Sequence, residues 1–365
     1  MPETTRFGRF FLPGPTEVRP EILEAQLRPM IGHRGKGMEE LIAQIQPGLK
    51  YVFRTERPVY ISTSSATGFM EAAIRNGARR RVLSLVNGAF SERFYKIALA
   101  CGLQADKVEV PLGQGHTPDM LEDALRRGDY DAVTVVHSET STGVLNPIRE
   151  LAEVAHAAGD VVLLVDSVSG LAGAPVETDA WKLDFVLTGA QKAFALPPGL
   201  AFGVAQPNIL KRAEQKPDRG VYFDFLEFEK YLEKNQTPNT PAVSLLYALA
   251  AQLEAIKKET IEARWERHAA MARRTWEWVE SMQGRGIDVQ VLAPEGFRSP
   301  TVTCIRVPKG WTGPQITAAL KERGYTISSG YGKLKDETIR IGHMGDHTVE
   351  ELDELLGVLE EVLTK

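Results

Sequence analysis

Cysteine is scarce in this sequence: its 365 residues include only two, Cys101 and Cys304, which are far apart. No CxxC pair is present, so we expect neither a disulfide framework nor a cysteine-ligated zinc site, and no other metal. Two isolated cysteines suit a reducing compartment, so the expected location is cytoplasmic.

Long apolar runs and an excess of basic residues are missing as well. No segment approaches 18 consecutive apolar residues, and the start, MPETTRFGRFFLPGPTEV, lacks the apolar stretch of a signal peptide. The 43 Lys and Arg residues are outnumbered by 48 Asp and Glu, which gives a net charge of −5 and a pI of about 5.9. A nucleic-acid binder carries a basic face instead. We therefore expect a soluble protein with no nucleic-acid or membrane partner.

What the sequence does contain is a regular alternation of apolar runs and amphipathic stretches. Such alternation, with nearly continuous apolar strands, predicts an α/β fold whose mainly parallel sheet lies between helices. The expected strands are 58–63, 81–86, 132–138, 161–167 and 185–189, and the expected helices are 67–77, 91–101, 118–127 and 148–158.

The pattern changes after about residue 242. Residues 242–283 are long-helical, and a strand–helix–strand–strand–helix pattern follows, which predicts a smaller α+β C-terminal domain. We expect an N-terminal segment (1–20) packing on the small domain and the active site, a large domain (21–257) and a small domain (258–365).

Polar residues follow several of the predicted strands directly. Ligands of open parallel sheets bind at the carboxyl ends of the strands, where Asp166 follows VVLLV and Lys192 comes three residues after FVLTG. TSSATG, after PVYIS, opens onto a helix whose N-terminus would suit an anion. Each feature also has an ordinary explanation: helix capping by Ser65 or Thr67, a strand-end turn, or a lysine that extends to solvent.

The three features together match the requirements of pyridoxal 5'-phosphate. A lysine among small apolar residues has a lowered pKa and can react with the aldehyde. An aspartate keeps the pyridine nitrogen protonated, so that the ring accepts electrons. A helix N-terminus binds the phosphate. Lys192, Asp166 and the turn at Ser65–Thr67 would supply these parts.

Motifs along nearly the whole chain resemble the class V pyridoxal-phosphate aminotransferases, in particular the alanine/serine–glyoxylate (serine–pyruvate) group. The similar segments are LPGPTEVRPEIL, ATGFMEAAIRN, NGAFSERF, HSETSTGVLNPI, LVDSVSGLAGAPVETDAWKLDFVLTGAQKAFALPPGLAFG, TPNTPAVSLLYAL and IRIGHMGD. The resemblance implies the type I fold of these transferases and a homodimer with shared active sites.

The resemblance also implies roles for individual residues. Lys192 matches the Schiff-base lysine that shuttles the proton, and Asp166 matches the partner of the pyridine nitrogen. The other cofactor positions are a phosphate turn (Ser65, Ala66, Thr67), ring contacts (Phe90, Ser141, Val168, Gln191) and two phosphate ligands from the second subunit (Thr237, Thr240). The family often has Gly where this chain has Ala66, which puts the cofactor affinity in doubt.

Three further residues are expected to bind substrate. Arg340, in TIRIGHMG, matches the arginine that binds the α-carboxylate, and a guanidinium fork suits a carboxylate. Gly14 belongs to a PGP loop expected to close over the same carboxylate. Arg34 is a candidate for a second, distal anionic group. Without the resemblance, an ordinary exposed strand arginine would be the favoured interpretation of Arg340. For Arg34, a surface arginine is as good an interpretation as a substrate contact.

The implied reaction is a ping-pong transfer of an amino group from alanine or serine to glyoxylate or pyruvate. The alternative is phosphoserine or aspartate with 2-oxoglutarate, which Arg34 would favour. A cysteine desulfurase-like lyase needs a nucleophilic cysteine on a mobile loop, whereas Cys304 lies in a strand-like segment and Cys101 at a helix end. A non-catalytic pyridoxal-phosphate protein would lack the lysine or the arginine, and both are present.

Overall fold

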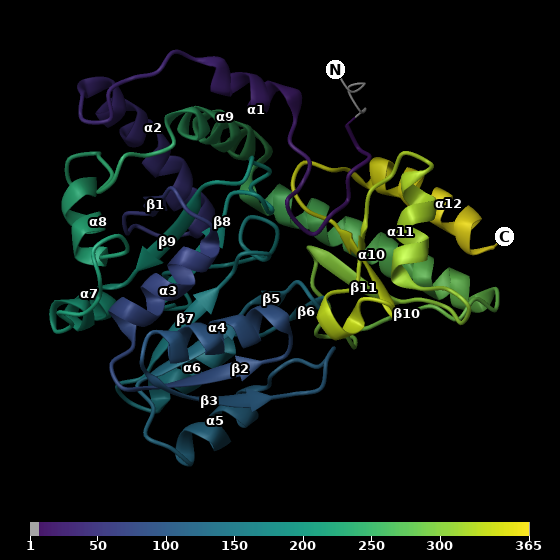
Figure 1. Ribbon diagram of the computed structural model, residues 1–365, viewed down its shortest axis with the longest axis horizontal. Coiled ribbons are helices and arrows are strands. Elements are labelled where there is room, and N and C mark those ends of the chain that lie inside the picture. Colours follow the sequence, from purple (N-terminus) through teal and green to yellow (C-terminus); the bar gives the residue numbers. More distant parts are fainter. Residues whose placement is uncertain (1–6, 365) are drawn as a thin grey trace.

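A seven-stranded sheet forms the centre of the large domain in the computed structural model, which describes residues 7–364 (Figure 1). Its strand order is β1-β9-β8-β7-β4-β2-β3. Six strands run in one direction and β9 runs opposite to them. The strands are β1 (Tyr60–Ser62), β2 (Arg81–Val86), β3 (Gln104–Glu109), β4 (Ala132–Val136), β7 (Val162–Asp166), β8 (Phe185–Gly189) and β9 (Ala201–Ala205).

Helices cover this sheet, and their apolar residues recur at helical spacing. In α6 (Ile148–Ala157) the buried residues are Ile148, Leu151, Ala152 and Ala155, which share one face. The other helices of the large domain are α1 (Pro20–Glu24), α2 (Lys36–Phe53), α3 (Ala66–Gly77), α4 (Ala89–Ala100), α5 (Pro118–Arg126), α7 (Pro207–Glu214), α8 (Phe225–Leu232) and α9 (Val243–Glu259), with a 3-10 turn at η1 (Ala25–Leu27). The predicted α/β fold is confirmed.

The small domain is built on a four-stranded antiparallel sheet of order β10-β11-β13-β12. Its helices pack beside the sheet at the yellow end of the chain (Figure 1). The elements are α10 (Ile261–Gly284), β10 (Gln290–Val291), β11 (Val302–Arg306), α11 (Gly313–Lys321), β12 (Ser328–Ser329), η2 (Gly332–Leu334), β13 (Thr338–Gly342) and α12 (Val349–Leu363). A two-stranded ribbon of β5 (Ser138–Glu139) and β6 (Val144–Leu145) lies near the domain boundary.

Two strands of the large sheet were missed by the sequence prediction. β3 is an edge strand with the polar sequence QADKVE, whose side chains are all partly or fully exposed, so it carries no apolar run. β9 contains Gly203, where an added Cβ would lie 3.0 Å from the Phe185 ring. A glycine at this close approach interrupts the β-branched pattern that marks a strand.

The N-terminal segment crosses between the two domains. Phe11 belongs to the core of the small domain, and its backbone N–H donates to the carbonyl of Thr326 at 2.8 Å. A few residues later, the Thr16 N–H donates to the carbonyl of Gln191 in the large domain at 3.0 Å. Residues 1–6 of the expected segment 1–20 lie outside the described residues. Among residues 7–364, no helix is both long and apolar enough to cross a membrane.

Arg264, in the second turn of α10, ties the two domains together. Its side chain is 1% exposed and pairs with Asp346, in the loop after β13, at 2.8 Å, and with Glu259 at 2.9 Å. Its Nη2 donates to the carbonyl of Ala193, next to Lys192, at 2.7 Å. One guanidinium thus holds the small domain, the end of α9 and the Lys192 turn in one arrangement.

We predict that Arg264→Ala destabilises the protein by about 3 kcal/mol, because the buried Asp346 would lose its nearest cation and keep only Gln252 and the more distant Arg19, at 3.7 Å. Arg273→Ala is the matched control: Arg273 pairs with Glu266 on the surface, with exposed fractions of 50% and 68%, and an exposed pair contributes about 0–1 kcal/mol. Denaturant unfolding of both variants measures the difference. Equal, small losses would contradict the role given to Arg264.

Candidate functional site

A cavity of about 400 Å³ opens at the carboxyl ends of the strands of the large sheet. Nine of the residues predicted from sequence line it: Gly14, Ser65, Ala66, Thr67, Phe90, Asp166, Val168, Gln191 and Lys192. They come from the N-terminal segment, the starts of α3 and α4, and the ends of β7 and β8. The fold therefore brings residues separated by up to 178 positions (Gly14 to Lys192) into one site.

Lys192 lies in the turn after β8 and is 7% exposed. Its ammonium donates a hydrogen bond to the carbonyl of Pro13, and within residues 7–364 it has no carboxylate in ion-pair contact. Burial, together with the nearby positive charge of Arg340, lowers the pKa of Lys192 to about 8. An amine with this pKa is available in its neutral, nucleophilic form close to neutral pH.

Gly14 packs directly against the lysine side chain. A Cβ added at Gly14 would lie 2.4–2.6 Å from three atoms of Lys192, and the residue has a φ of +94°. The positive φ favours glycine, and a side chain at this position would also displace the end of the Lys192 side chain. The Thr16 Oγ1 also donates to the Lys192 carbonyl at 3.2 Å, so the N-terminal segment covers the lysine and fixes its turn.

Asp166, the last residue of β7, forms another wall of the cavity. Its Oδ1 accepts a hydrogen bond from the Val168 N–H at 2.8 Å. Burial, with a contribution from the Glu139 carboxylate, raises the pKa of Asp166 to about 7. A buried carboxylate without a cationic partner in contact is suited to a ligand that supplies a protonated nitrogen.

The N-terminus of α3 has the features of an anion-binding site. Ser65 occupies the N-cap position, but its side chain makes no capping hydrogen bond and the first turn contains no acidic residue. Capping by this hydroxyl therefore does not explain the motif. Arg93, one turn after Phe90 in α4, also lines the cavity, and its Nη1 lies 3.5 Å from the Thr67 Oγ1. Helix N–H groups, hydroxyls and a guanidinium together favour phosphate.

Arg340, in the middle of β13, is 7% exposed, so it is not an exposed strand arginine. Its Nε donates to the Ser329 carbonyl at 3.1 Å and its Nη1 to the Thr140 carbonyl at 3.3 Å. Within residues 7–364 it has no ion pair with a carboxylate. A buried guanidinium held only by carbonyls is suited to a carboxylate ligand.

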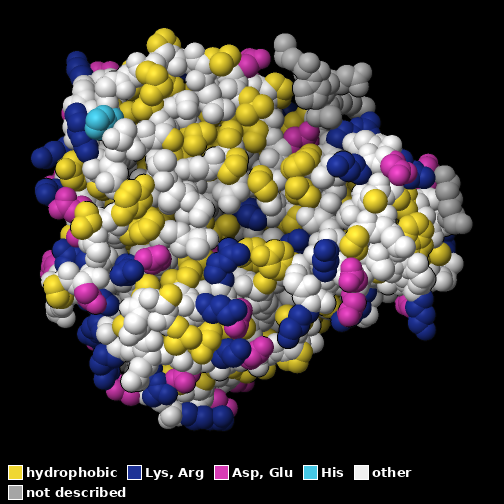
Figure 2. Space-filling model, in the orientation of Figure 1, with side chains coloured by type: hydrophobic (Ala, Val, Ile, Leu, Met, Phe, Trp, Pro, Cys, Tyr) yellow, Lys and Arg dark blue, Asp and Glu magenta, His cyan; other side chains and the backbone are white. Residues whose placement is uncertain are grey.

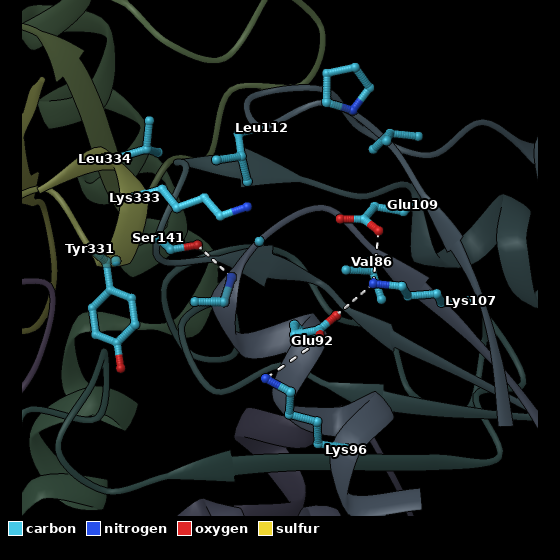
Figure 3. A pocket seen from close by; sticks show the side chains of 15 residues that line it. Val86, Glu92, Lys96, Lys107, Glu109, Leu112, Ser141, Tyr331, Lys333 and Leu334 are labelled. Carbon is cyan, nitrogen blue, oxygen red and sulfur yellow. Dashed lines mark hydrogen bonds and ion pairs between the residues drawn. The ribbon is translucent and has the colours of Figure 1, made fainter. Parts of the chain in front are cut away.

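Ser141 does not lie on the wall of the Lys192 cavity. Its hydroxyl donates to Glu139 at 2.6 Å and accepts from the Ala89 N–H at 3.0 Å, facing a neighbouring hollow (Figure 3). The expected contact of Ser141 with the cofactor ring therefore stays a prediction, and Thr140 is the neighbouring hydroxyl that lines the cavity. Neighbouring side chains of a short strand and turn point in different directions, and sequence cannot tell which one faces the cavity.

The buried carboxylate of Glu139 holds the start of α4, which carries Phe90. Its carboxylate accepts from the Ser91 N–H at 2.9 Å and from the Phe90 N–H at 3.3 Å, at the start of α4. A carboxylate at a helix N-terminus is stabilised by the helix dipole. Glu139, Arg93 and Thr140 were not predicted as site residues, although all three lie within the motifs NGAFSERF and HSETSTGVLNPI.

Thr237, Thr240 and Arg34 lie outside the cavity and form a group of their own. Arg34 donates to the carbonyls of Thr237 at 2.6 Å and Pro238 at 2.8 Å, and its guanidinium stacks over the Tyr231 ring at 4.7 Å. In this chain, Arg34 thus holds the loop that carries the two threonines. The resemblance had assigned that loop to a neighbouring subunit's site.

Comparisons with known proteins identify the family. Residues 23–355 match the class V aminotransferases, and the chain belongs to this family. It is 38% identical to an uncharacterised aminotransferase of Methanocaldococcus jannaschii (92% of this chain, 87% of that protein). It is 33% identical to a serine–glyoxylate aminotransferase of Methylorubrum extorquens (95% and 89%). A solved aspartate aminotransferase of Thermus thermophilus superposes with a TM-score of 0.89 and 31% identity, covering 98% and 99%.

The protein is therefore an aminotransferase with the fold of pyridoxal-phosphate enzymes, and its cavity fits that cofactor. The reactive amine of Lys192, the carboxylate of Asp166 and the anion site at the start of α3 line the same 400 Å³ space. These are the three groups that the aldehyde, the pyridine nitrogen and the phosphate require.

We predict that the rate at which an amine-labelling reagent modifies Lys192 in the cofactor-free protein rises with pH, with a midpoint at the lysine pKa of about 8. Since the pKa is lowered, the reactive neutral amine dominates above pH 8 and is lost as the pH falls below it. Lys230, an exposed lysine whose pKa Glu227 raises, is the internal control and should react only at higher pH. Peptide mass spectrometry follows both sites. Identical profiles for the two lysines would contradict the account.

Proposed function

We propose that this aminotransferase moves an amino group from alanine or serine to glyoxylate or pyruvate. The observation that carries the proposal is the position of Arg340: its Nη1 donates to the carbonyl of Thr140, a residue that lines the Lys192 cavity, and its charge contributes to the lowered pKa of Lys192. A carboxylate bound at Arg340 would present its α-carbon near the lysine amine. The serine–glyoxylate enzyme of Methylorubrum extorquens supports the choice of substrates.

Each residue of the site has a separate task in this reaction. Arg340 binds the α-carboxylate, which the amino acid and the 2-oxo acid have in common, so one site serves both halves of a ping-pong cycle. Lys192 would hold the cofactor through its Nζ, and the same amine is placed to move the proton at the substrate α-carbon. Asp166 would pair with the pyridine nitrogen and keep it protonated. Pyridoxal phosphate, when bound, supplies the electron sink for that proton transfer.

The N-terminal segment excludes water from this chemistry. Pro13 and Gly14 lie against the lysine side chain, and Lys192 is nearly inaccessible. Exclusion of water keeps the amine desolvated and strengthens the interactions of Arg340 and Asp166 with their ligands.

An acidic donor, aspartate or phosphoserine with 2-oxoglutarate, is the second candidate. The similarity to the Thermus thermophilus aspartate aminotransferase favours it. Against it, both terminal nitrogens of Arg34, the residue expected to bind a distal anion, donate to loop carbonyls of this chain.

A cysteine desulfurase-like reaction lacks its nucleophile. Cys304 is buried within β11, and burial raises the pKa of its thiol to about 11. Burial also raises the pKa of Cys101. Neither thiol is in the thiolate form near neutral pH.

We also propose a homodimer. Large apolar side chains are exposed near the start of α1 and in the loop before α8: Leu23 at 45%, Leu27 at 84%, Met30 at 72%, Val221 at 87% and Tyr222 at 43%. Figure 2 shows hydrophobic side chains gathered on the upper part of the large domain, where Figure 1 places α1 and α9. Tyr222 lines a small hollow together with Thr237 and Thr240. Covering this surface with a second copy would bury it and bring the threonine loop to the neighbouring site.

The substrate proposal predicts the outcome of a half-reaction screen. The loaded enzyme is mixed with alanine, serine, aspartate or phosphoserine without an acceptor, and the loss of the cofactor absorption at about 420 nm is followed. We expect alanine or serine to convert it and glyoxylate or pyruvate to restore it. Lys192→Ala is expected to be inactive with every donor. Conversion by aspartate or phosphoserine alone would establish the second candidate instead.

The dimer proposal predicts a solution mass of twice 40.3 kDa, measured by light scattering on the eluate of a gel-filtration column. Leu27→Glu with Met30→Glu should shift the mass toward the monomer, because two charges would be buried in the contact. Leu99→Glu, another exposed apolar residue at 45% but on α4, is the control and should stay dimeric. A wild-type monomer would refute the proposal.

A further inference from the structure

Tyr331 lies where the two domains meet beside the active site. It precedes η2 in the small domain and is 40% exposed. It stands at the edge of a second hollow, of about 520 Å³, between the start of α4, the end of β3 and the loop 331–334 (Figure 3). None of the roles given above involves Tyr331.

The Tyr331 ring contacts two residues of the substrate site. The guanidinium carbon of Arg340 lies over the ring, 5.5 Å from its centroid. The Phe90 ring lies against it from the large domain, with 5.5 Å between centroids and an angle of 35° between the planes. One aromatic ring thus contacts Arg340 on one side and Phe90, in the wall of the Lys192 cavity, on the other.

Within residues 7–364 no hydrogen bond joins Arg340 to Tyr331, so their contact is the one between the guanidinium and the ring. The carbonyls of Ser329 and Thr140 already take Nε and one donor of Nη1. A ring in cation–π contact accepts no N–H group of the guanidinium in a conventional hydrogen bond, restrains the guanidinium by electrostatic attraction and limits the access of water to it. The remaining donors therefore stay available in a fixed orientation.

The backbone around Tyr331 is specified closely. A Cβ at Gly330 would lie 1.9 Å from the Leu334 carbonyl oxygen and 2.3 Å from Thr338 Oγ1, and Gly332 has a φ of +56°. Two glycines therefore allow the loop to fold onto β13 and hold the ring at Arg340. The other side of the ring borders the open hollow, so shortening the side chain leaves no buried void.

We propose that Tyr331 is a positioning residue for the substrate carboxylate: it holds the Arg340 guanidinium in the plane in which that group binds amino-acid and 2-oxo-acid carboxylates. The inference rests on the proposed function of Arg340. Because both substrates use the same arginine, Tyr331 affects the affinity for both and has little influence on the proton transfer at Lys192.

The test compares three variants as loaded enzymes. Tyr331→Leu removes the ring but keeps apolar bulk, Tyr331→Phe keeps the ring, and Lys333→Gln alters the same loop without touching Arg340. The measured quantities are the inhibition constant of propanoate, a carboxylate without an amino group, and the KM and kcat for donor and acceptor. Melting temperatures are recorded beside them.

Tyr331→Leu should raise the propanoate inhibition constant and both KM values by about three- to tenfold, the size expected for a partly desolvated cation–π contact, with kcat changed less than about twofold. Tyr331→Phe should recover most of the affinity, and Lys333→Gln should behave as the wild type. The inference would be overturned if the inhibition constant of Tyr331→Leu were unchanged, or if the Phe and Leu variants lost equal affinity. It would also be overturned if only kcat and the melting temperature fell. A wild-type enzyme that propanoate does not inhibit and no amino acid converts would instead refute the proposed function.

Discussion

The site depends on keeping two cations, Lys192 and Arg340, buried near one another with no carboxylate in contact with either within the described chain. Burial lowers the pKa of both groups, and the positive charge of Arg340 lowers the pKa of Lys192 further. Such an arrangement is unfavourable for the empty protein, and proteins usually avoid it by pairing buried charges. Here the two positions are satisfied by backbone carbonyls, which hold the cations in place without neutralising them. Both cations can therefore bind an anionic ligand without first breaking an ion pair.

Each of the two cations comes from a different domain, so their relative position depends on the contacts between domains. Lys192 belongs to the large domain and Arg340 to the small one. Arg264 connects the two through Ala193 and Asp346, and the N-terminal segment connects them through Phe11 and Thr16. A change in either connection would alter the distance between the lysine and the arginine, although neither connection touches the ligands.

The sequence predicted the centre of the site better than its edges. Asp166, Lys192 and the start of α3 each follow a buried apolar strand, and parallel strands place such residues at one edge of the sheet. Arg93 gave no signal of this kind, because a single arginine in an amphipathic helix resembles a solvated one. Thr140 and Ser141 show another limit: a motif locates a segment, and only the turn geometry decides which of two adjacent hydroxyls lines the cavity. β3 and β9 were missed because an exposed edge and a close-packed glycine remove the apolar pattern that marks a strand.

The most direct test of the account is to find which lysine holds the cofactor. Borohydride reduction of the loaded protein, followed by peptide mass spectrometry, should show one pyridoxyl-phosphate adduct, on the peptide that contains Lys192. An adduct on another lysine, or none on Lys192 while the protein is active, would contradict the central claim that this buried, unpaired amine is the reactive group.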